Sequence, residues 1–92
     1  MELKDTIEGM LSSDYRERFK AEYMQARIRR MKLANMIDKY IHDELSFQPM
    51  CSPTLLMAQC AAMDSYILLL DERARLECID LTDVINKIQC FT

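Results

Sequence analysis

Glycine and proline are scarce in this chain of 92 residues, which has one Gly (Gly9) and two Pro. A single glycine excludes the Gly-rich loops of dinucleotide-binding and Walker motifs and the nucleophile elbow of hydrolases. It also removes the residues that tight β-hairpins prefer at their turns. Valine occurs once, whereas Leu occurs eleven times and Met eight times, so local propensity favours helix over strand. The composition therefore predicts an all-α fold.

Metal-binding and redox motifs are missing as well. The one histidine is His42, and the cysteines are too far apart for a C-x-x-C pair, so no metal site is predicted. The N-terminus lacks the basic and apolar regions of a signal peptide, and we expect reduced, packed thiols in the cytoplasm. Disulfides are the alternative, and they require a secretory context. The four cysteines are Cys51, Cys60, Cys78 and Cys90.

Helical spacing of apolar residues divides a single domain, residues 1–92, into four helices. The predicted segments are a short helix at 2–11, long helices at 14–44 and 53–78, and a short helix at 82–91. Residues 12–14 offer N-caps to the first long helix, and Ser52 followed by Pro53 is typical of a helix start. Both prolines lie in the connection between the long helices, where the chain can reverse. The sequence thus predicts an antiparallel hairpin of two long helices with a short helix at each end.

Apolar residues occupy more than one face of the predicted hairpin. On the first long helix, one stripe is expected to form the intrachain core: Tyr15, Phe19, Tyr23, Ala26, Leu33, Ile37, Tyr40 and Ile41. A second set lies on other faces of the two long helices: Met24, Ile28, Met31, Met57 and Leu68. Because a two-helix hairpin leaves this second set exposed to water, we expect it to form the interface of a helical homo-oligomer. The alternative is that the terminal helices fold back over these residues.

The basic residues gather in one segment, although the net charge of the chain is −3. Residues 16–32, called the basic segment below, hold seven Arg or Lys against two Glu, a local charge of +5, and the remainder carries −8. Arginine binds phosphate oxygens in bidentate fashion and an aromatic ring can stack on a base, so the segment is a candidate anion site. The alternative is a solvated face paired with nearby acids. The candidate ligand-binding residues are Tyr15, Arg16, Lys20, Arg27 and, from the second long helix, Arg73.

Other partners and activities have little support in the sequence. With a pI near 5.1, the chain lacks the basic footprint that duplex nucleic acid requires. Its longest apolar run, residues 66–70, is far below the ~20 residues that span a bilayer, so we expect no membrane partner. His42 lies beside two acids near the predicted end of a helix, where a surface role is expected, and no thiol has a neighbouring His or cation cluster. We therefore predict no enzyme, no catalytic residue and no cofactor.

Two stretches of the chain carry a resemblance to known phage proteins. Residues 15–37 read YRERFKAEYMQARIRRMKLANMI, with an R-x3-E-Y start and an R-I-x2-(x)-K-L middle. Residues 55–77 read LLMAQCAAMDSYILLLDERARLE, in which an L-x2-Q-x3-M-x2-Y-x3-L-x2-R pattern falls on Leu56, Gln59, Met63, Tyr66, Leu70 and Arg73. These motifs resemble a set of small phage proteins related to a crAss-like phage helical hairpin. They also look like the anti-CBASS and anti-Thoeris nucleotide sponges.

The resemblance to the sponges implies a function. It implies a helical homo-oligomer, often a hexamer, that sequesters a cyclic di- or trinucleotide immune signal in the host cytoplasm without chemistry. The basic residue that such proteins place on the first long helix would correspond to Arg27, and a base-stacking tyrosine to Tyr15. The position near Arg30 is often a small residue in that family, so this chain departs from the pattern there.

A second hypothesis belongs to a different class, a protein–protein interaction module. Met24, Ile28 and Met31, with arginines around them, would suit a surface that docks on a host protein and inhibits it. The sequence leaves both hypotheses open, together with the identity of the nucleotide and the number of subunits.

Overall fold

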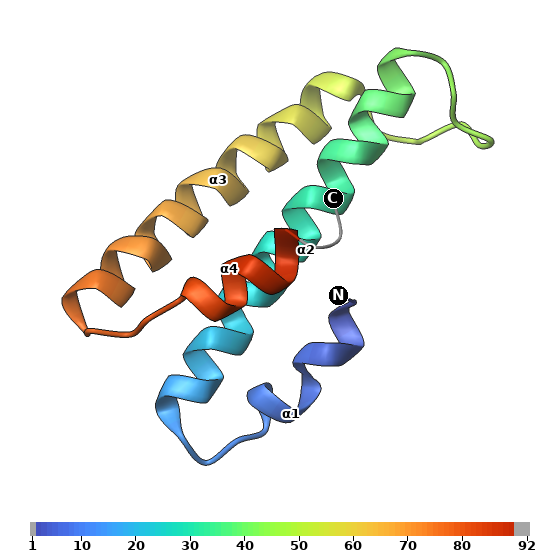
Figure 1. Cartoon of the computed structure of the whole chain (residues 1–92). Coiled ribbons are helices and arrows are strands. Elements are labelled where there is room, and N and C mark those ends of the chain that lie inside the picture. Colours follow the sequence, from blue (N-terminus) through green and yellow to red (C-terminus); the bar gives the residue numbers. More distant parts are fainter. Residues whose placement is uncertain (1, 90–92) are drawn as a thin grey trace.

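The computed structural model describes residues 2–89, and this part of the chain is helical without strands (Figure 1). A 3-10 turn, η1 (Leu3–Thr6), runs into the short helix α1 (Ile7–Met10). The two long helices are α2 (Tyr15–Ile41) and α3 (Pro53–Leu76), and α4 (Thr82–Gln89) closes the described chain. The prediction of an all-α protein is confirmed. The end of the predicted 82–91 helix lies outside the described residues.

Local sequence explains where the long helices begin and end. The Asp14 side chain accepts a hydrogen bond of 2.9 Å from the Arg16 backbone N–H, and Ser52 accepts one of 3.2 Å from Leu55. Both side chains satisfy N–H groups that the first turn leaves free. Beyond the C-terminal ends, Asp43 and Cys78 adopt left-handed backbone angles, with φ of 57° and 56°, which turn the chain away from the helix axis.

Helices α2 and α3 lie side by side and run in opposite directions (Figure 1). At one end the Tyr15 hydroxyl donates to Glu77, and in the middle Arg30 donates to Asp64. At the other end the Tyr40 hydroxyl donates to the Cys51 carbonyl oxygen, at 3.2 Å. Residue numbers rise along α2 while those of its partners fall. The polar ties therefore fix the register of the pair along its whole length.

The core has two parts. The larger lies among α2, α3 and α4: Phe19, Tyr23, Met24, Ala26, Ile28, Ile67, Leu70, Ala74, Ile79, Leu81, Val84 and Ile88. The smaller lies near the connection between the long helices: Ile37, Leu56 and Cys60. The Cys60 thiol is buried as expected, whereas Cys51 and Cys78 are exposed, so the expectation of packed thiols is wrong for these two. Tyr15 and Ile41, both expected in the core, are instead 45% and 58% exposed because they lie at the two ends of α2.

The expectation that Met24 and Ile28 lack an intrachain cover is wrong. Their exposed fractions are 9% and 0%, because α4 packs on α2 and brings Val84 and Ile88 into the same cluster. The alternative, that the terminal helices fold back, therefore holds for these two residues. A docking surface made of them is not present on the folded chain. Met31 is half-buried.

Met57 and Leu68, the other residues of the predicted interface, remain exposed on α3. This helix contacts α2 along one side, and much of its remaining surface is apolar. Within residues 2–89, α3 is the one helix that is long and apolar enough to cross a membrane by length and composition. Only 17% of its most apolar 18-residue stretch is buried. An unusually apolar helix is thus left largely uncovered.

The single glycine, Gly9, permits a close contact between α1 and α2. A Cβ atom at Gly9 would lie 2.9 Å from the Cβ of Ala21 and 3.3 Å from the carbonyl oxygen of Glu17. Two small residues therefore let α1 approach the α2 backbone and lay the N-terminal segment along it (Figure 1).

Candidate functional site

Three of the five predicted ligand-binding residues meet where α2 begins and α3 ends. The Tyr15 hydroxyl accepts a hydrogen bond of 2.9 Å from Nη2 of Arg73 and donates one of 2.7 Å to Oε1 of Glu77. Arg73 also lies 3.4 Å from Oε2 of Glu77, one turn further along the helix. Arg16 reaches across from α2 and donates to the Cys78 carbonyl oxygen at 3.1 Å. We call these four side chains the tip cluster: Tyr15, Arg16, Arg73 and Glu77.

Aromatic rings form the floor of the tip cluster. The guanidinium carbon of Arg73 lies 5.1 Å from the centroid of the buried Phe19 ring, a cation–π contact. The ring of Tyr15 lies 6.3 Å from that of Phe19 and leaves part of its own surface open to solvent. The first turn of α2 adds the positive end of a 27-residue helix. The cluster thus combines an exposed aromatic surface with two guanidinium groups.

The charges within the tip cluster are mutually stabilised. The hydrogen bond from Tyr15, followed by contact with Arg73, lowers the pKa of the Glu77 carboxyl group. The same hydrogen bond raises the pKa of Tyr15, and the tyrosine hydroxyl in turn raises the pKa of Arg73. At neutral pH the cluster holds Arg73 charged, Glu77 charged and Tyr15 neutral. An anionic ligand would therefore compete with Glu77 for the Arg73 guanidinium.

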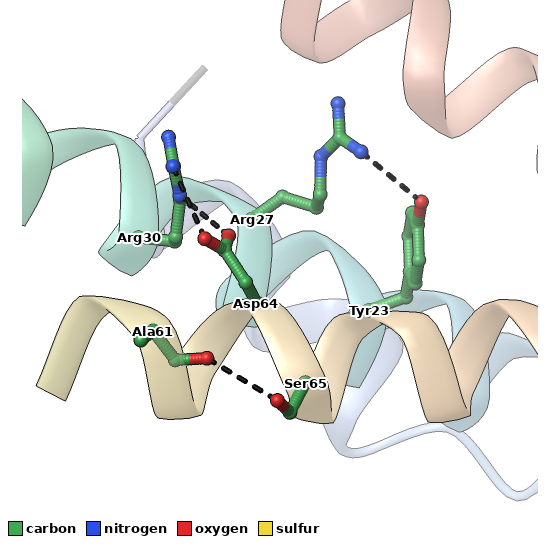
Figure 2. Close-up of polar contacts among 6 residues, drawn as sticks. All are labelled: Tyr23, Arg27, Arg30, Ala61, Asp64 and Ser65. Carbon is green, nitrogen blue, oxygen red and sulfur yellow. Dashed lines mark hydrogen bonds and ion pairs between the residues drawn. The ribbon is translucent and has the colours of Figure 1, made fainter. Parts of the chain in front are cut away.

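The structure does not bring Lys20 and Arg27 into the tip cluster. Nζ of Lys20 lies 4.0 Å from the Asp83 carboxylate of α4. Nη1 of Arg27 lies 3.4 Å from the Tyr23 hydroxyl, and its guanidinium carbon lies 5.8 Å from the centroid of that ring (Figure 2). Burial, followed by a hydrogen bond with Asp71, raises the pKa of Tyr23. These two cations belong to the packing of α2 against α4 and α3.

Arg30 links the two long helices. The sponge proteins that this sequence resembles often carry a small residue near this position. Nε of Arg30 donates to Oδ1 of Asp64 at 2.7 Å and its Nη2 donates to Oδ2 at 3.3 Å, as Figure 2 shows. The hydrogen bond to Asp64 raises the pKa of Arg30. On the same turn of α3, the Ser65 hydroxyl donates to the Ala61 carbonyl oxygen. A bidentate arginine thus links α2 to α3 at a position outside the tip cluster.

Sequence reasoning missed Glu77, Tyr66 and Glu22, which line the same side of the helix pair as Arg73. The Tyr66 hydroxyl donates a hydrogen bond to the Glu22 carboxylate. The spacing of Arg73 and Glu77, four residues apart on one helix, was a usable signal for their pairing. No local signal pairs Tyr66 with Glu22, because the two residues meet through the register of α2 and α3.

The pH dependence of the Tyr66 hydrogen bond provides a first prediction. Donation to the Glu22 carboxylate, together with partial burial, raises the pKa of Tyr66 to about 12 from an ordinary value of 10.0. A folded-state pKa above the unfolded value means that this contribution to stability is full below pH 10 and is lost as the pH rises toward 12. Tyrosinate absorbance of the native protein should include a step near pH 12 from Tyr66, in addition to the steps of Tyr15 and Tyr23, whose pKa values are also raised. Tyr66→Phe should remove that step and flatten the alkaline fall in melting temperature, and an unchanged late step would contradict the assignment.

The structure also contains an acidic cavity and an apolar groove. The cavity, of about 330 Å³, lies among η1, α1, α2 and α4, and its charged lining is Asp5, Glu8, Glu17, Asp83, Lys20 and Lys87. Because acids outnumber lysines there, it is ill suited to an anion. The apolar groove, of about 260 Å³, is lined by Met57, Ala61 and their neighbours across α2 and α3. Within residues 2–89, no group of three His, Cys, Asp or Glu side chains is placed to hold a metal ion.

Comparison with known proteins gives one match. A family model described as Sequestin matches residues 13–76, which take in α2, the connection and α3. The matched range includes Tyr15, Arg16 and Arg73 of the tip cluster and ends one residue before Glu77. No curated protein and no solved structure matches the chain.

Proposed function

Because the chain belongs to the Sequestin family, whose name suggests a sequestering role, we propose that it binds and withholds a small signalling ligand. The ligand of this proposal is a cyclic di- or trinucleotide immune signal in the host cytoplasm. The protein binds it without chemistry, as a homo-oligomer with the ligand between subunits. The tip cluster is the observation that supports the proposal.

The side chains of the tip cluster match the chemistry of a cyclic nucleotide. Arg16 and Arg73 present forked donors that fit phosphate oxygens, and Arg73 is already oriented by the Phe19 ring. The ring of Tyr15, 45% exposed, offers a base a stacking surface. The phosphate displaces Glu77 from Arg73 and takes over its hydrogen bonds. The rest of the basic segment, including Lys20 and Arg27, attracts the anion at longer range.

The openness of the cluster supports a site between subunits. Tyr15, Arg16 and Arg73 are all exposed on one chain, so a ligand bound there alone would keep much of its surface in water. Tight small-molecule sites usually enclose most of their ligand. A second copy of the chain would supply the missing wall and convert a surface patch into a pocket.

Ligand screening tests the proposal directly. Purified protein is heated with each member of a panel of cyclic di- and trinucleotides, with linear dinucleotides of the same bases as controls. A ligand at 100 times its Kd adds about 2.7 kcal/mol to the free energy of unfolding, which raises the Tm of a domain this size by roughly 10 °C or more. Chromatography of the heat-released ligand should return it intact. An unchanged Tm with every cyclic nucleotide well above micromolar concentration would contradict the proposal, and a cleaved ligand would contradict binding without chemistry.

A further inference from the structure

Helix α3 carries a second apolar row that nothing in the described chain covers. Its members are spaced every seven residues and are called the heptad face: Leu55, Ala62, Leu69 and Leu76. The three leucines are 59%, 65% and 67% exposed. The row that packs on α2 lies on a different side of the helix and contains Leu56, Ile67 and Leu70. Residues seven apart keep to one side of a helix, so this row runs for about 31 Å as a single line along which another helix can lie.

The exposed area of the chain is larger than a monomer of its mass requires. The chain exposes 6402 Å² for a mass of 10.8 kDa, whereas a folded monomer of that mass exposes about 5,500 Å². The difference is close to the roughly 800 Å² that each partner buries in a standard protein–protein interface. The excess exposed area is therefore of the size that a second subunit would bury.

We propose that the heptad face binds α3 of a second copy of this chain in antiparallel orientation. Pairing the rows about their common centre sets Leu55 against the partner's Leu76, and Ala62 against the partner's Leu69. Each small residue then faces a large one, which fills the space between the helices. A parallel pair would instead set Ala62 against the partner's Ala62 and leave a gap.

The charges on α3 favour the same orientation. Residues 53–63 contain no charged side chain, whereas residues 64–77 contain six. A parallel pair would bring the two charged halves together, with like charges opposite one another. The antiparallel pair sets each charged half against an uncharged half, and it also aligns the helix dipoles favourably. Charge and side-chain size therefore point to one arrangement.

This interface also supplies the second wall of the ligand pocket, and that role rests on the proposed function. Tyr66 and Arg73 stand three and four residues from Leu69, so they lie at the edge of the heptad face beside the tip cluster. In the antiparallel pair, the partner's Gln59 comes to lie next to Arg73. The second wall of the ligand pocket is then the uncharged half of the partner's α3, with Gln59 as its hydrogen-bonding side chain.

A lipid bilayer is the competing occupant of this face, and the structure disfavours it. Helix α2 runs along α3, and Arg30 of α2 is bonded to Asp64 in the middle of α3. Insertion of α3 would either carry the charges of α2 into hydrocarbon or break this pair. Four further charges follow within α3 itself, at residues 71–75.

Light scattering on the full chain without nucleotide tests the interface. The expected mass is that of two chains or of a larger even number of chains. Leu69→Glu should weaken association at least 100-fold while helicity stays unchanged, since the side chain is exposed. The matched control is Leu11→Glu, because Leu11 is 81% exposed but lies outside α3, and it should associate like the native protein. A native mass of one chain, with or without binding to phosphatidylglycerol vesicles, would overturn the proposal. So would normal association of Leu69→Glu.

A charge pair tests the orientation. In the antiparallel arrangement, Leu55→Lys combined with Leu76→Glu forms opposite-charge pairs across the interface, whereas Leu55→Lys combined with Leu76→Lys forms like-charge pairs. The first double variant should associate at least tenfold more tightly than the second. Equal association would overturn the antiparallel pairing. Because neither measurement contains nucleotide, failure to bind a ligand leaves this interface standing. A monomer that binds nucleotide contradicts the interface and the placement of the ligand between subunits, but not the binding itself.

Discussion

Replacing Ile28 with aspartate is expected to unfold the protein. The Ile28 side chain is completely buried beneath α4, in the cluster that contains Val84 and Ile88. Removing a buried isoleucine costs about 2–5 kcal/mol, and placing a carboxylate in the same space adds a desolvation penalty. The total is comparable to the whole free energy of unfolding of a small domain, about 5–15 kcal/mol. Circular dichroism should show lost helicity at room temperature.

The control for this prediction is the same substitution at an exposed apolar position. Met57 lies in α3 and is 51% exposed, so Met57→Asp introduces the same helix-disfavouring residue without burying a charge. This variant should retain its helicity and a cooperative melt. If Ile28→Asp melts like Met57→Asp, then α4 does not cover α2 in solution. Binding experiments that use Ile28→Asp would report unfolding rather than a lost docking surface.

The difference between Ile28 and Met57 shows what sequence periodicity can and cannot predict. Helix propensity, N-caps and the scarcity of glycine act locally, so the helical character of the chain follows from the sequence. The apolar spacing of residues 82–91 also indicates an amphipathic helix. Which surface that helix covers depends on the path of the chain after Cys78, where the backbone adopts φ of 56°. No periodic pattern encodes that path.

The sequence does not predict the heptad face either, for a different reason. Leu55 and Leu69 each precede another leucine, so the sequence alone does not show which member of each pair faces the neighbouring helix. Neighbouring residues on a helix point about 100° apart, so only one of each pair can face α2. Leu56 and Leu70 are buried, and Leu55 and Leu69 are left outside. A helix that is apolar on several sides does not reveal by itself which side meets the neighbouring helix.

The candidate site also contains residues that the sequence groups correctly and residues that only the fold brings together. Arg16, Lys20 and Arg27 share one side of a helix, and the sequence therefore groups them. In the fold, Lys20 lies near Asp83 and Arg27 near Tyr23, so Arg16 alone of the three joins the tip cluster. Contacts across 58 and 62 residues of sequence bring in Arg73 and Glu77. Only the register between α2 and α3 determines such long-range pairs.

Replacing Arg73 with alanine is expected to weaken binding of the cyclic nucleotide by about 10- to 100-fold, because the phosphate loses charge-assisted hydrogen bonds. Titration calorimetry with the ligand found by screening measures the effect. Arg29→Ala is the matched control, since Arg29 lies in the basic segment, is exposed and is not part of the tip cluster. It should change Kd by no more than about threefold, as expected for a distant charge screened by salt. Equal losses for the two variants would mean that both arginines act only through their charge, and that the tip cluster is not the binding site.

Glu77→Gln separates a ligand-binding role of Arg73 from a structural one. Both Arg73→Ala and Glu77→Gln remove the ion pair between α3 and its C-cap, so a purely structural role predicts the same fall in Tm and the same effect on binding. If Arg73 binds phosphate, the two variants differ in sign. Glu77→Gln frees the guanidinium from its competitor and removes a negative charge beside the ligand, so the affinity should hold or rise while that of Arg73→Ala falls. Parallel losses in both variants would assign the tip cluster to folding and move the ligand site elsewhere on the protein.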